Sequence, residues 1–516
     1  EELAAIARNA TDEAAETEPP GAGVGPVPAT PIMHWFRELH GPTDDYSQRM
    51  LLHAPPGLDL DHLTGALQTV LDHHDMLRLR VTGDGFEITE PGTVDAAALV
   101  RRVDVAGLDG EALKAVLAEE GAAARSRLRP DAGIMAQLVH FDAGPTAQGR
   151  LLLTLHHLVV DGVSWRILLP DLVTAWAAIA AGQTPRLEPV GTSFRRWAQR
   201  LVAEATDPGR VAELDTWLEI GRTPDPQLGD RPLDPDVDTF GSARQLTLTL
   251  PPEVTEPLLT TVPAAYHGRV NDVLLTGLAL AVAHRRPGAQ TAVLVNLEGH
   301  GREEIFPGVD LSRTAGWFTS ISPVRLDPGP VDWEEVRTGG PQVGTALKTV
   351  KEQLRETPDN GIGYGLLRHL NPATAGKLAG LPRPQIAFNY LGRVTADDGG
   401  QAADWSPAAP DEAEALGPGQ NPGLAMPHVL EISAHTRDLP TGPQLHATWI
   451  WPGDLLAEEQ VRALAEAWFE ALRGLVAHAS TEGAGGFTPS DLSLVDLTQD
   501  EIDEFEAELD DWELEQ

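Results

Sequence analysis

Two adjacent histidines, His156 and His157, followed by Asp161 and Gly162, are the clearest candidates for chemistry in this chain. Imidazole gains and loses a proton near neutral pH, so it suits general acid and base catalysis. The pair lies in the nearly continuous apolar run Leu151–Val160, which is typical of a buried strand. Neighbouring strand side chains point to opposite faces, so we expect only one histidine in a site. The alternative is a pair of buried, hydrogen-bonded structural histidines.

A second apolar run, TAVLVNLEGHGR, ends at Glu298 and also passes into a glycine loop. If the two runs belong to lobes that face each other, both ends meet in one interdomain cleft, a common place for a site. From the residue alone, Glu298 is best interpreted as a solvated loop acid. Asp161 lies just past the first run, and we expect a buried ion pair with Arg302 rather than a base. Removing one partner of such a pair costs about 3–5 kcal/mol.

The helix and strand patterns around these residues predict an α/β protein of two lobes. Mixed helix and strand patterns cover residues 31–220 and 241–480, and the proline-rich stretch 221–240 separates them. Residues 1–30 read as the end of a helix and a linker, and residues 481–516 as a glycine-rich and then acidic tail.

Within the lobes, hydrophobic periodicity predicts individual helices and strands. Helices are expected over 61–74, 164–181 and 461–478, and strands over 244–250, 291–297, 385–390, 428–434 and 445–451. Ser164 is expected to cap the N-terminus of the helix over 164–181. Trp165 is expected to be a packing residue. His73 and His74 end the first helix and are expected to be structural.

Composition excludes several classes of function. The chain has 38 basic and 77 acidic residues, a formal charge of -39, which argues against nucleic acid and anionic membranes as partners. It has no cysteine, which excludes disulfides and thiolate metal sites and fits a cytoplasmic location. Lysine is scarce, which weakly disfavours a pyridoxal-phosphate enzyme. The motifs of phosphate loops, dinucleotide sites, HExxH metal sites and G-x-S-x-G nucleophiles are all missing from the sequence.

The pattern HHxxxDG at His156–Gly162 resembles the superfamily of condensation-type and chloramphenicol-acetyltransferase-like acyl-transfer enzymes. Spacing alone leaves open which histidine is active, and the resemblance implies that it is His157. It also implies two chloramphenicol-acetyltransferase-like lobes in a V-shaped pseudo-dimer, with an active-site tunnel between them that admits a carrier's phosphopantetheine arm.

Five further strings resemble the epimerization domains of nonribosomal peptide synthetases. They are PIMHWF (31–36), HHDMLRLR (73–80), NLEGHGRE (296–303), GIGYGLLR (361–368) and FNYLGR (388–393). A peptide-bond-forming condensation domain is expected to carry Asn after Gly-x-Phe in the second lobe. Here Gly316-Trp317-Phe318 is followed by Thr319 and Ser320. The resemblance therefore implies an enzyme that inverts the Cα of a carrier-bound aminoacyl or peptidyl thioester.

Such an inversion removes the Cα proton, holds a planar enolate and returns a proton to the other face. The resemblance matches Glu298 to the family's glutamate, and a carboxyl group with a pKa raised by partial burial suits this task. Asn389 and Tyr390 alternate faces of a short strand, so one could hydrogen-bond the enolate oxygen or the substrate amine, and packing is an equal alternative. Tyr364, between two glycines, could line the tunnel or fill a turn.

The resemblance implies that no metal or cofactor is bound in the chain. The phosphopantetheine arrives on an external carrier domain, because no carrier serine motif is present, and residues 1–10 resemble the last helix of such a carrier. A downstream condensation domain or the next synthetase subunit is the other expected partner. Two alternatives stay open: a condensation domain, and a non-catalytic docking module.

The tail is assigned two competing interpretations. Residues 488–491 resemble the motif that closes epimerization domains. Thr498 and Glu501 form a possible capping box, with Ile502, Phe505 and Leu509 on one face of the helix that would follow. The helix is either a frayed acidic tail or a docking segment that folds against a basic partner.

Overall fold

The chain folds into two compact units, each assembled from three segments, and each is considered by itself. Unit 1 consists of Glu1–Asp207, His300–Thr319 and Gly399–Leu424, and unit 2 of Pro208–Gly299, Ser320–Asp398 and Ala425–Gln516. The computed structural model describes residues 18–19, 21–83, 85–286, 290–395, 403–417, 419–492, 494–495 and 497–505. The predicted α/β class with two lobes is confirmed. The predicted lobes were continuous ranges, whereas both units are discontinuous in sequence.

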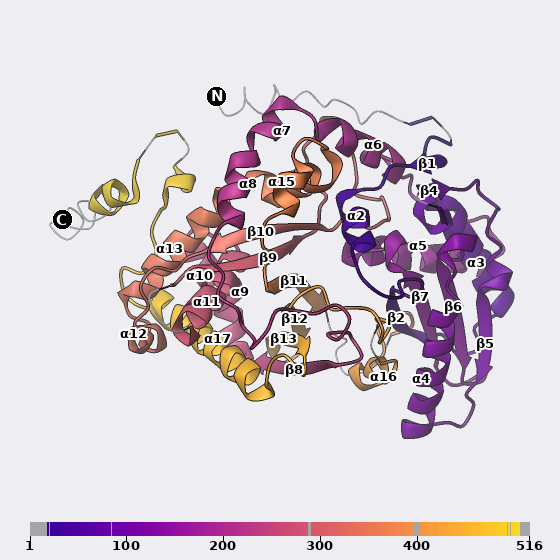
Figure 1. Ribbon diagram of the computed structural model, residues 1–516. Helices are drawn as coiled ribbons and strands as arrows, with labels where there is room; N and C mark the ends of the chain where they lie inside the picture. The colour runs from indigo at the N-terminus through magenta and orange to yellow at the C-terminus, as the bar shows by residue number, and fades with distance from the viewer. Residues whose placement is uncertain are drawn as a thin grey trace, which may run out of the picture. The chain divides into compact units, whose positions relative to one another are not determined.

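Unit 1 is centred on a four-stranded sheet. Its order is β2 (Ser47–Ala54), β7 (Gly149–His156), β6 (Ala136–Asp142), β5 (Val100–Asp104); β5 and β6 are parallel and the other pairs antiparallel. The leucines of β7 are buried along the whole strand, which explains the unbroken apolar run in the sequence. Helix α4 (Gly110–Ser126) lies alongside β6 (Figure 1). Its Leu117 is buried in a cluster with residues of this sheet.

Helix α5 (Gly162–Ala180) follows β7 and packs against α3 (Leu60–His73). The predicted helices 164–181 and 61–74 thus agree within two residues. By length and apolar composition α5 could cross a membrane. However, Trp165, Ile167, Leu168 and other residues are buried within the protein, as in the core helix of a globular unit.

The remaining elements of unit 1 are short. They are the helices α2 (Pro31–Arg37), α6 (Phe194–Glu204) and α16 (Pro410–Ala415), and a three-stranded sheet in the order β1 (Gly25–Val27), β4 (Gly85–Ile88), β3 (Leu79–Thr82). Strand β1 lies in a stretch that the sequence indicated as linker. The predicted helix at residues 1–10 lies outside the described residues.

Unit 2 is centred on a six-stranded sheet in which β11 is parallel to both neighbours and all other pairs are antiparallel. The order is β10 (Ser320–Leu326), β9 (Val293–Gly299), β11 (Ile386–Thr395), β12 (Leu430–Leu439), β13 (Gly442–Pro452), β8 (Ala243–Leu250). All five strands predicted for this region are present, each with ends shifted by a few residues.

One face of this sheet forms the core of unit 2. Helices α11 (Val270–Arg285) and α17 (Glu458–Ala479) pack there (Figure 1). Trp468 of α17 makes an edge contact with Trp449 of β13. Along β12 buried and half-buried residues alternate, so every second side chain faces away from this core. The opposite face therefore carries polar side chains from the central strands.

The other helices of unit 2 surround this sheet or connect its strands. They are α7 (Pro208–Ala212), α8 (Leu214–Gly221), α9 (Pro252–Leu259), α10 (Thr261–Ala265), α12 (Trp333–Thr338), α13 (Pro341–Arg355), α14 (Ile362–Gly365) and α15 (Ala375–Ala379).

Candidate functional site

His156 and His157 do not share a strand. Strand β7 ends at His156, and His157 opens a 3-10 turn that runs to Val159. The prediction of a strand as far as Val160 was wrong, because the chain must turn here to enter α5. His156 is buried at 0% exposure and His157 is half-buried. The conclusion that they occupy different environments still holds, but the turn is its cause.

His156 has both ring nitrogens occupied. Nε2 donates to the carbonyl of Thr43 at 3.0 Å, and Nδ1 accepts from the backbone N–H of Leu158 at 3.2 Å. Burial lowers the pKa of His156 to about 4, outweighing the Thr43 carbonyl, which favours the charged ring. A neutral ring with both nitrogens in use has no position left for proton transfer, so His156 is structural.

His157, by contrast, is hydrogen-bonded through Nε2 to a side chain rather than to the backbone. Its Nε2 accepts from the side-chain amide of Gln48 at 2.8 Å, and the Oε1 of Gln48 accepts from the indole N–H of Trp165 at 2.7 Å. The ring stacks on Tyr46 and lies 4.2 Å from the ring of Trp317. Burial lowers the pKa of His157 to about 4, although backbone carbonyls and the carboxylate of Asp161 favour the charged form. The resting ring is therefore neutral at pH 7.

Asp161 and Arg302 form the expected ion pair. The guanidinium Nη2 of Arg302 lies 3.2 and 3.3 Å from the two carboxylate oxygens, and both residues are nearly inaccessible to solvent. Nη1 of Arg302 donates to the carbonyls of Leu311 and Thr314, and its guanidinium lies over the ring of Phe318. The sequence placed Arg302 in the second lobe, whereas segment 300–319 is part of unit 1.

Asp161, not Ser164, caps helix α5. The Asp161 carboxylate accepts from the backbone N–H of Ser164 at 2.7 Å, so the predicted cap at Ser164 was wrong. The Ser164 hydroxyl donates instead to Asp161 or to the Gly316 carbonyl and accepts from the Gly316 N–H. Asp161 also accepts from the N–H of Phe318 at 3.2 Å. These contacts fix the Gly316–Phe318 segment, which carries Trp317 to the His157 ring.

Glu298 lies in strand β9 of unit 2, on the polar face of the sheet. Its Oε2 accepts from the side-chain amide of Asn389 in β11 at 2.7 Å. Burial raises the pKa of Glu298 to about 7; the negative charge of Glu431 adds to this, and the Asn389 hydrogen bond opposes it. The interpretation of Glu298 as a solvated loop acid does not fit, because the side chain is half-buried within a strand.

The two aromatic candidates of unit 2 have packing contacts. Tyr390 follows Asn389 on the other face of β11, where its ring packs against the core and its hydroxyl contacts that of Thr436 at 2.9 Å. Tyr364 in α14 makes an edge contact with Trp217 of α8. The structure thus brings Asn389 to Glu298 and leaves Tyr390 and Tyr364 in other environments.

The sequence did not indicate two sets of residues that lie near the candidate groups. Gln48 lies in β2, and an isolated glutamine in a strand pattern carries no chemical signal. Near Glu298, Asn296 donates to Nε2 of His428 at 2.9 Å, and Nδ1 of His428 lies 3.5 Å from Glu431. In the sheet, Ala387 is paired with both Asn296 and Glu431. Only strand register, which the sequence does not reveal, brings these groups together.

His73, His74 and Asp171 place three possible metal-ligand atoms within 4.8 Å of one another. The oxygens of Asp171 already accept from Nε2 of His74 at 2.8 Å and from Nη2 of Arg313 at 2.5 and 2.6 Å. A guanidinium held on the only carboxylate of this group opposes binding of a cation. The group is therefore a buried hydrogen-bonded cluster, in line with the structural role expected for both histidines.

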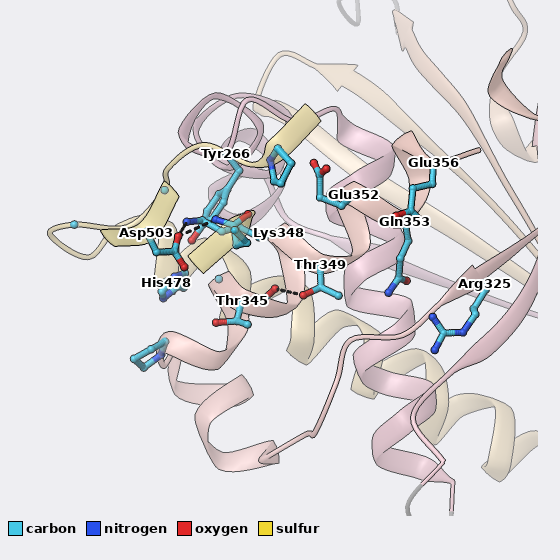
Figure 2. Close-up of a pocket in the computed structure, with 16 residues that line it drawn as sticks. Tyr266, Arg325, Thr345, Lys348, Thr349, Glu352, Gln353, Glu356, His478 and Asp503 are labelled. Carbon is cyan, nitrogen blue, oxygen red and sulfur yellow. Dashed lines mark hydrogen bonds and ion pairs between the residues drawn. The ribbon is translucent and has the colours of Figure 1, made fainter. Parts of the chain in front are cut away.

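The tail of unit 2 packs against helix α13. Asp491 pairs with the buried Lys351 at 2.5 Å. Asp503 pairs with Lys348 at 2.8 Å (Figure 2). The predicted capping box is present, since Glu501 accepts from both the N–H and the hydroxyl of Thr498. Ile502 is buried and Phe505 is 60% exposed, so they do not share one apolar face; Leu509 lies outside the described residues.

A cavity of about 530 Å³ lies between this tail and α13, and Figure 2 shows its lining. Tyr266, Lys348, Glu352, His478 and Asp503 are among the residues that surround it. It contains none of the site residues predicted from the sequence. Two of its charged side chains, Lys348 and Asp503, pair with each other.

Comparisons with known proteins place these residues in context. Residues 26–415 match the family described as Condensation domain. A linear gramicidin synthase polypeptide of Brevibacillus parabrevis is 37% identical over 495 residues, which are 94% of this chain and 6% of that protein. Chondramide synthase cmdD of Chondromyces crocatus is 37% identical over 511 residues, 97% of this chain and 12% of that protein. The chain thus spans a small part of the length of these relatives.

Solved structures show the same fold. The epimerization domain from the third module of tyrocidine synthetase B superimposes with a TM-score of 0.76 at 29% identity, covering 90% of this chain and 99% of that one. The condensation domain of the Monacolin K polyketide synthase MokA gives 0.63 at 16% identity, covering 88% and 98%.

Proposed function

The chain belongs to the condensation-domain family, and from that premise we propose that it is an epimerization domain of a nonribosomal peptide synthetase. It inverts the Cα of an aminoacyl or peptidyl group held as a thioester on the phosphopantetheine arm of a separate carrier domain. The likeness to a solved epimerization domain over nearly the whole chain supports this assignment over other members of the family.

The observation that carries the proposal is the Glu298–Asn389 pair. Proton transfer at Cα needs a group whose two protonation states are both populated near neutral pH, and a carboxyl group with a pKa near 7 satisfies that condition. Asn389 holds one oxygen of Glu298 and thereby fixes the orientation of the other. In this role Glu298 takes the Cα proton or delivers a proton to it.

His157 is the second proton-transfer group in the proposal. It is neutral at pH 7 and its Nε2 carries an unprotonated lone pair, so it is competent as a base, and its conjugate acid can return the proton. His156 cannot take this role, because both of its nitrogens are committed to the backbone. Asp161 and Arg302 support the loop rather than the chemistry.

The test uses a separate carrier domain loaded with an L-aminoacyl thioester in D2O. The domain should incorporate one deuterium at Cα and yield a mixture of L and D product, read by mass spectrometry and chiral chromatography after hydrolysis. Amide formation with a second loaded carrier, without Cα exchange, would establish the condensation alternative. Binding of carrier without either reaction would establish the docking alternative.

Variants of the two groups assign their roles. His157→Ala and Glu298→Gln should each fold and lose Cα exchange by about 10²–10⁴-fold, the usual contribution of a general acid or base. The exposed residues His40 and Glu459 supply matched controls, His40→Ala and Glu459→Gln, which should exchange at the rate of the parent. A near-parental rate in either site variant removes that residue from its proposed role.

The proposed partners follow from the same assignment. A peptidyl carrier domain upstream supplies the thioester, and a condensation domain downstream, or the next synthetase subunit, accepts the D-configured product. Phosphopantetheine is part of the substrate here, and the proposal requires no metal ion or resident cofactor.

A further inference from the structure

The hydrogen bonds around His157 form a directional chain that begins at Trp165. The indole N–H of Trp165 can only donate, and the side chain is buried, so its partner must be an acceptor. That partner is Oε1 of Gln48. Reversing the Gln48 amide would set its NH2 against the indole N–H, and two donors would face each other. Trp165 therefore fixes which end of the amide points to His157.

The fixed amide in turn fixes the proton on the imidazole ring. With Oε1 on Trp165, the NH2 of Gln48 is the group that faces Nε2 of His157 at 2.8 Å. An amide NH2 can only donate, so Nε2 must be the acceptor. In the neutral ring the proton then resides on Nδ1. Neither the family comparison nor the sequence indicates this relation between Gln48 and His157.

We infer that Gln48 is a positioning residue that holds His157 in the Nδ1–H tautomer and so makes Nε2 the atom that receives the Cα proton. The opposite tautomer would place two N–H donors 2.8 Å apart, and so would the protonated ring. Gln48 thus also favours the unprotonated base before substrate arrives. When Nε2 takes the proton, the contact with Gln48 becomes donor against donor, and the amide must rotate away from the ring.

Besides Gln48, three groups act on the protonation of the His157 ring: the backbone carbonyls of His157 and Val160 and the carboxylate of Asp161 all favour a proton on it. Asp161 is the charged group among them, and the rings of Tyr46 and Trp317 lie against the imidazole. Burial outweighs these three groups, so the ring is neutral at pH 7 and carries its one proton on either Nδ1 or Nε2. The inference rests on the proposed function for its effect on catalysis, but the tautomer itself does not depend on turnover.

The experiment is nitrogen-15 NMR of histidine-labelled full chain at pH 7, with the His157 signals assigned by their loss in His157→Ala. In the parent, Nδ1 should give the protonated-type signal and Nε2 the unprotonated type. In Gln48→Glu the carboxylate only accepts, so Nε2 should carry a proton and give the protonated-type signal. An unchanged pattern in a folded Gln48→Glu protein overturns the inference, whatever its activity.

Trp165→Phe is a second variant that leaves Gln48 in place. Without the indole donor the amide can adopt either orientation, so both tautomers should be populated and the Cα exchange rate should fall by about twofold if they are equal. Gln48→Glu should lose about 10²-fold or more, as expected for a misplaced base proton. If Nε2 becomes protonated in Gln48→Glu as expected, but the parent shows no Cα exchange, the proposed function is refuted and the inference stands.

Gln137 provides a matched control for the glutamate substitution. It lies in β6 of the same sheet, is buried, and accepts from Nε of Arg127 at 2.9 Å without touching His157. Gln137→Glu introduces the same charge in the same unit and should leave the His157 signals and the exchange rate unchanged. If it alters both as Gln48→Glu does, the effect is one of general charge and the inference is wrong.

Discussion

Removing the Asp161 carboxylate should destabilise the protein far more than removing an exposed partner of an ordinary ion pair. Asp161 is 4% exposed and accepts from Arg302, from the backbone N–H groups of Ser164 and Phe318, and from the Ser164 hydroxyl. In Asp161→Ala the guanidinium of Arg302 keeps its place between two carbonyls and loses its counter-charge, and α5 loses its cap.

The cost of an unpaired buried charge is about 3–5 kcal/mol, and this range already exceeds the loss of a helix cap, about 0.5–2 kcal/mol. In a domain of about 150–250 residues, 1 kcal/mol corresponds to about 2–4 °C of melting temperature. We therefore expect Asp161→Ala to melt roughly 10 °C below the parent. Arg302→Ala should behave similarly, because it leaves the carboxylate unpaired.

The assay is a double-mutant cycle by thermal or urea denaturation, with circular dichroism as the readout. Because each single change already breaks the pair, the double variant should lose less than the sum, with a coupling energy of about 0.5–3 kcal/mol. Arg129→Ala is the control, since its partner Asp131 is 67% exposed and such pairs contribute about 0–1 kcal/mol. Full additivity of Asp161→Ala and Arg302→Ala would refute the contact as an energetic unit.

The pH–rate profile of Cα exchange should have a limb near pH 7 set by Glu298; Asn389→Leu removes a donor to the carboxylate and should move it upward, whereas Glu431→Gln removes a like charge and should move it downward. Shifts in one direction for both variants would contradict this assignment. The pKa of His156 is about 4 when folded against 6.5 in the unfolded chain, so its stabilising contribution is complete above pH 6.5 and is lost as the pH falls toward 4. The urea midpoint should thus fall less between pH 7 and pH 5 in His156→Gln than in the parent, and equal falls would exclude His156 as the cause. Treatment with EDTA should leave exchange and melting temperature unchanged, and stoichiometric metal by elemental analysis would overturn the cofactor-free proposal. Deleting residues 498–516 should preserve exchange but reduce transfer to a downstream synthetase partner at low salt, and unchanged transfer would show that the tail is not a docking segment.

The sequence was most informative where periodicity and chemistry coincide. The alternation of β12 and the amphipathic pattern of α17 predicted elements that the structure contains, and the ion pair between Asp161 and Arg302 followed from two charged residues beside buried strands. The two elements depend on local pattern, which a single sequence displays directly, whereas the ion pair joins residues 141 positions apart.

What the sequence could not show depends on contacts between distant segments. The turn at His157, the cap at Asp161 in place of Ser164, and the membership of Arg302 in unit 1 are set by tertiary packing. The same is true of Gln48, whose two partners lie 109 and 117 residues away in the chain. A glutamine in a strand becomes informative only when the donors around it are known.

The discontinuous make-up of unit 1 has a consequence for the order of events during synthesis. At the sheet edge, Leu52 of β2 forms an isolated β-bridge with Pro407. Arg150 of β7 forms a bidentate ion pair with Glu412. Glu412 leaves the ribosome 262 residues after the arginine that it pairs with. Domains generally fold as units during translation, the N-terminal one first. Here the first unit cannot finish until most of the second has been made, so neither should fold from a chain truncated near residue 300.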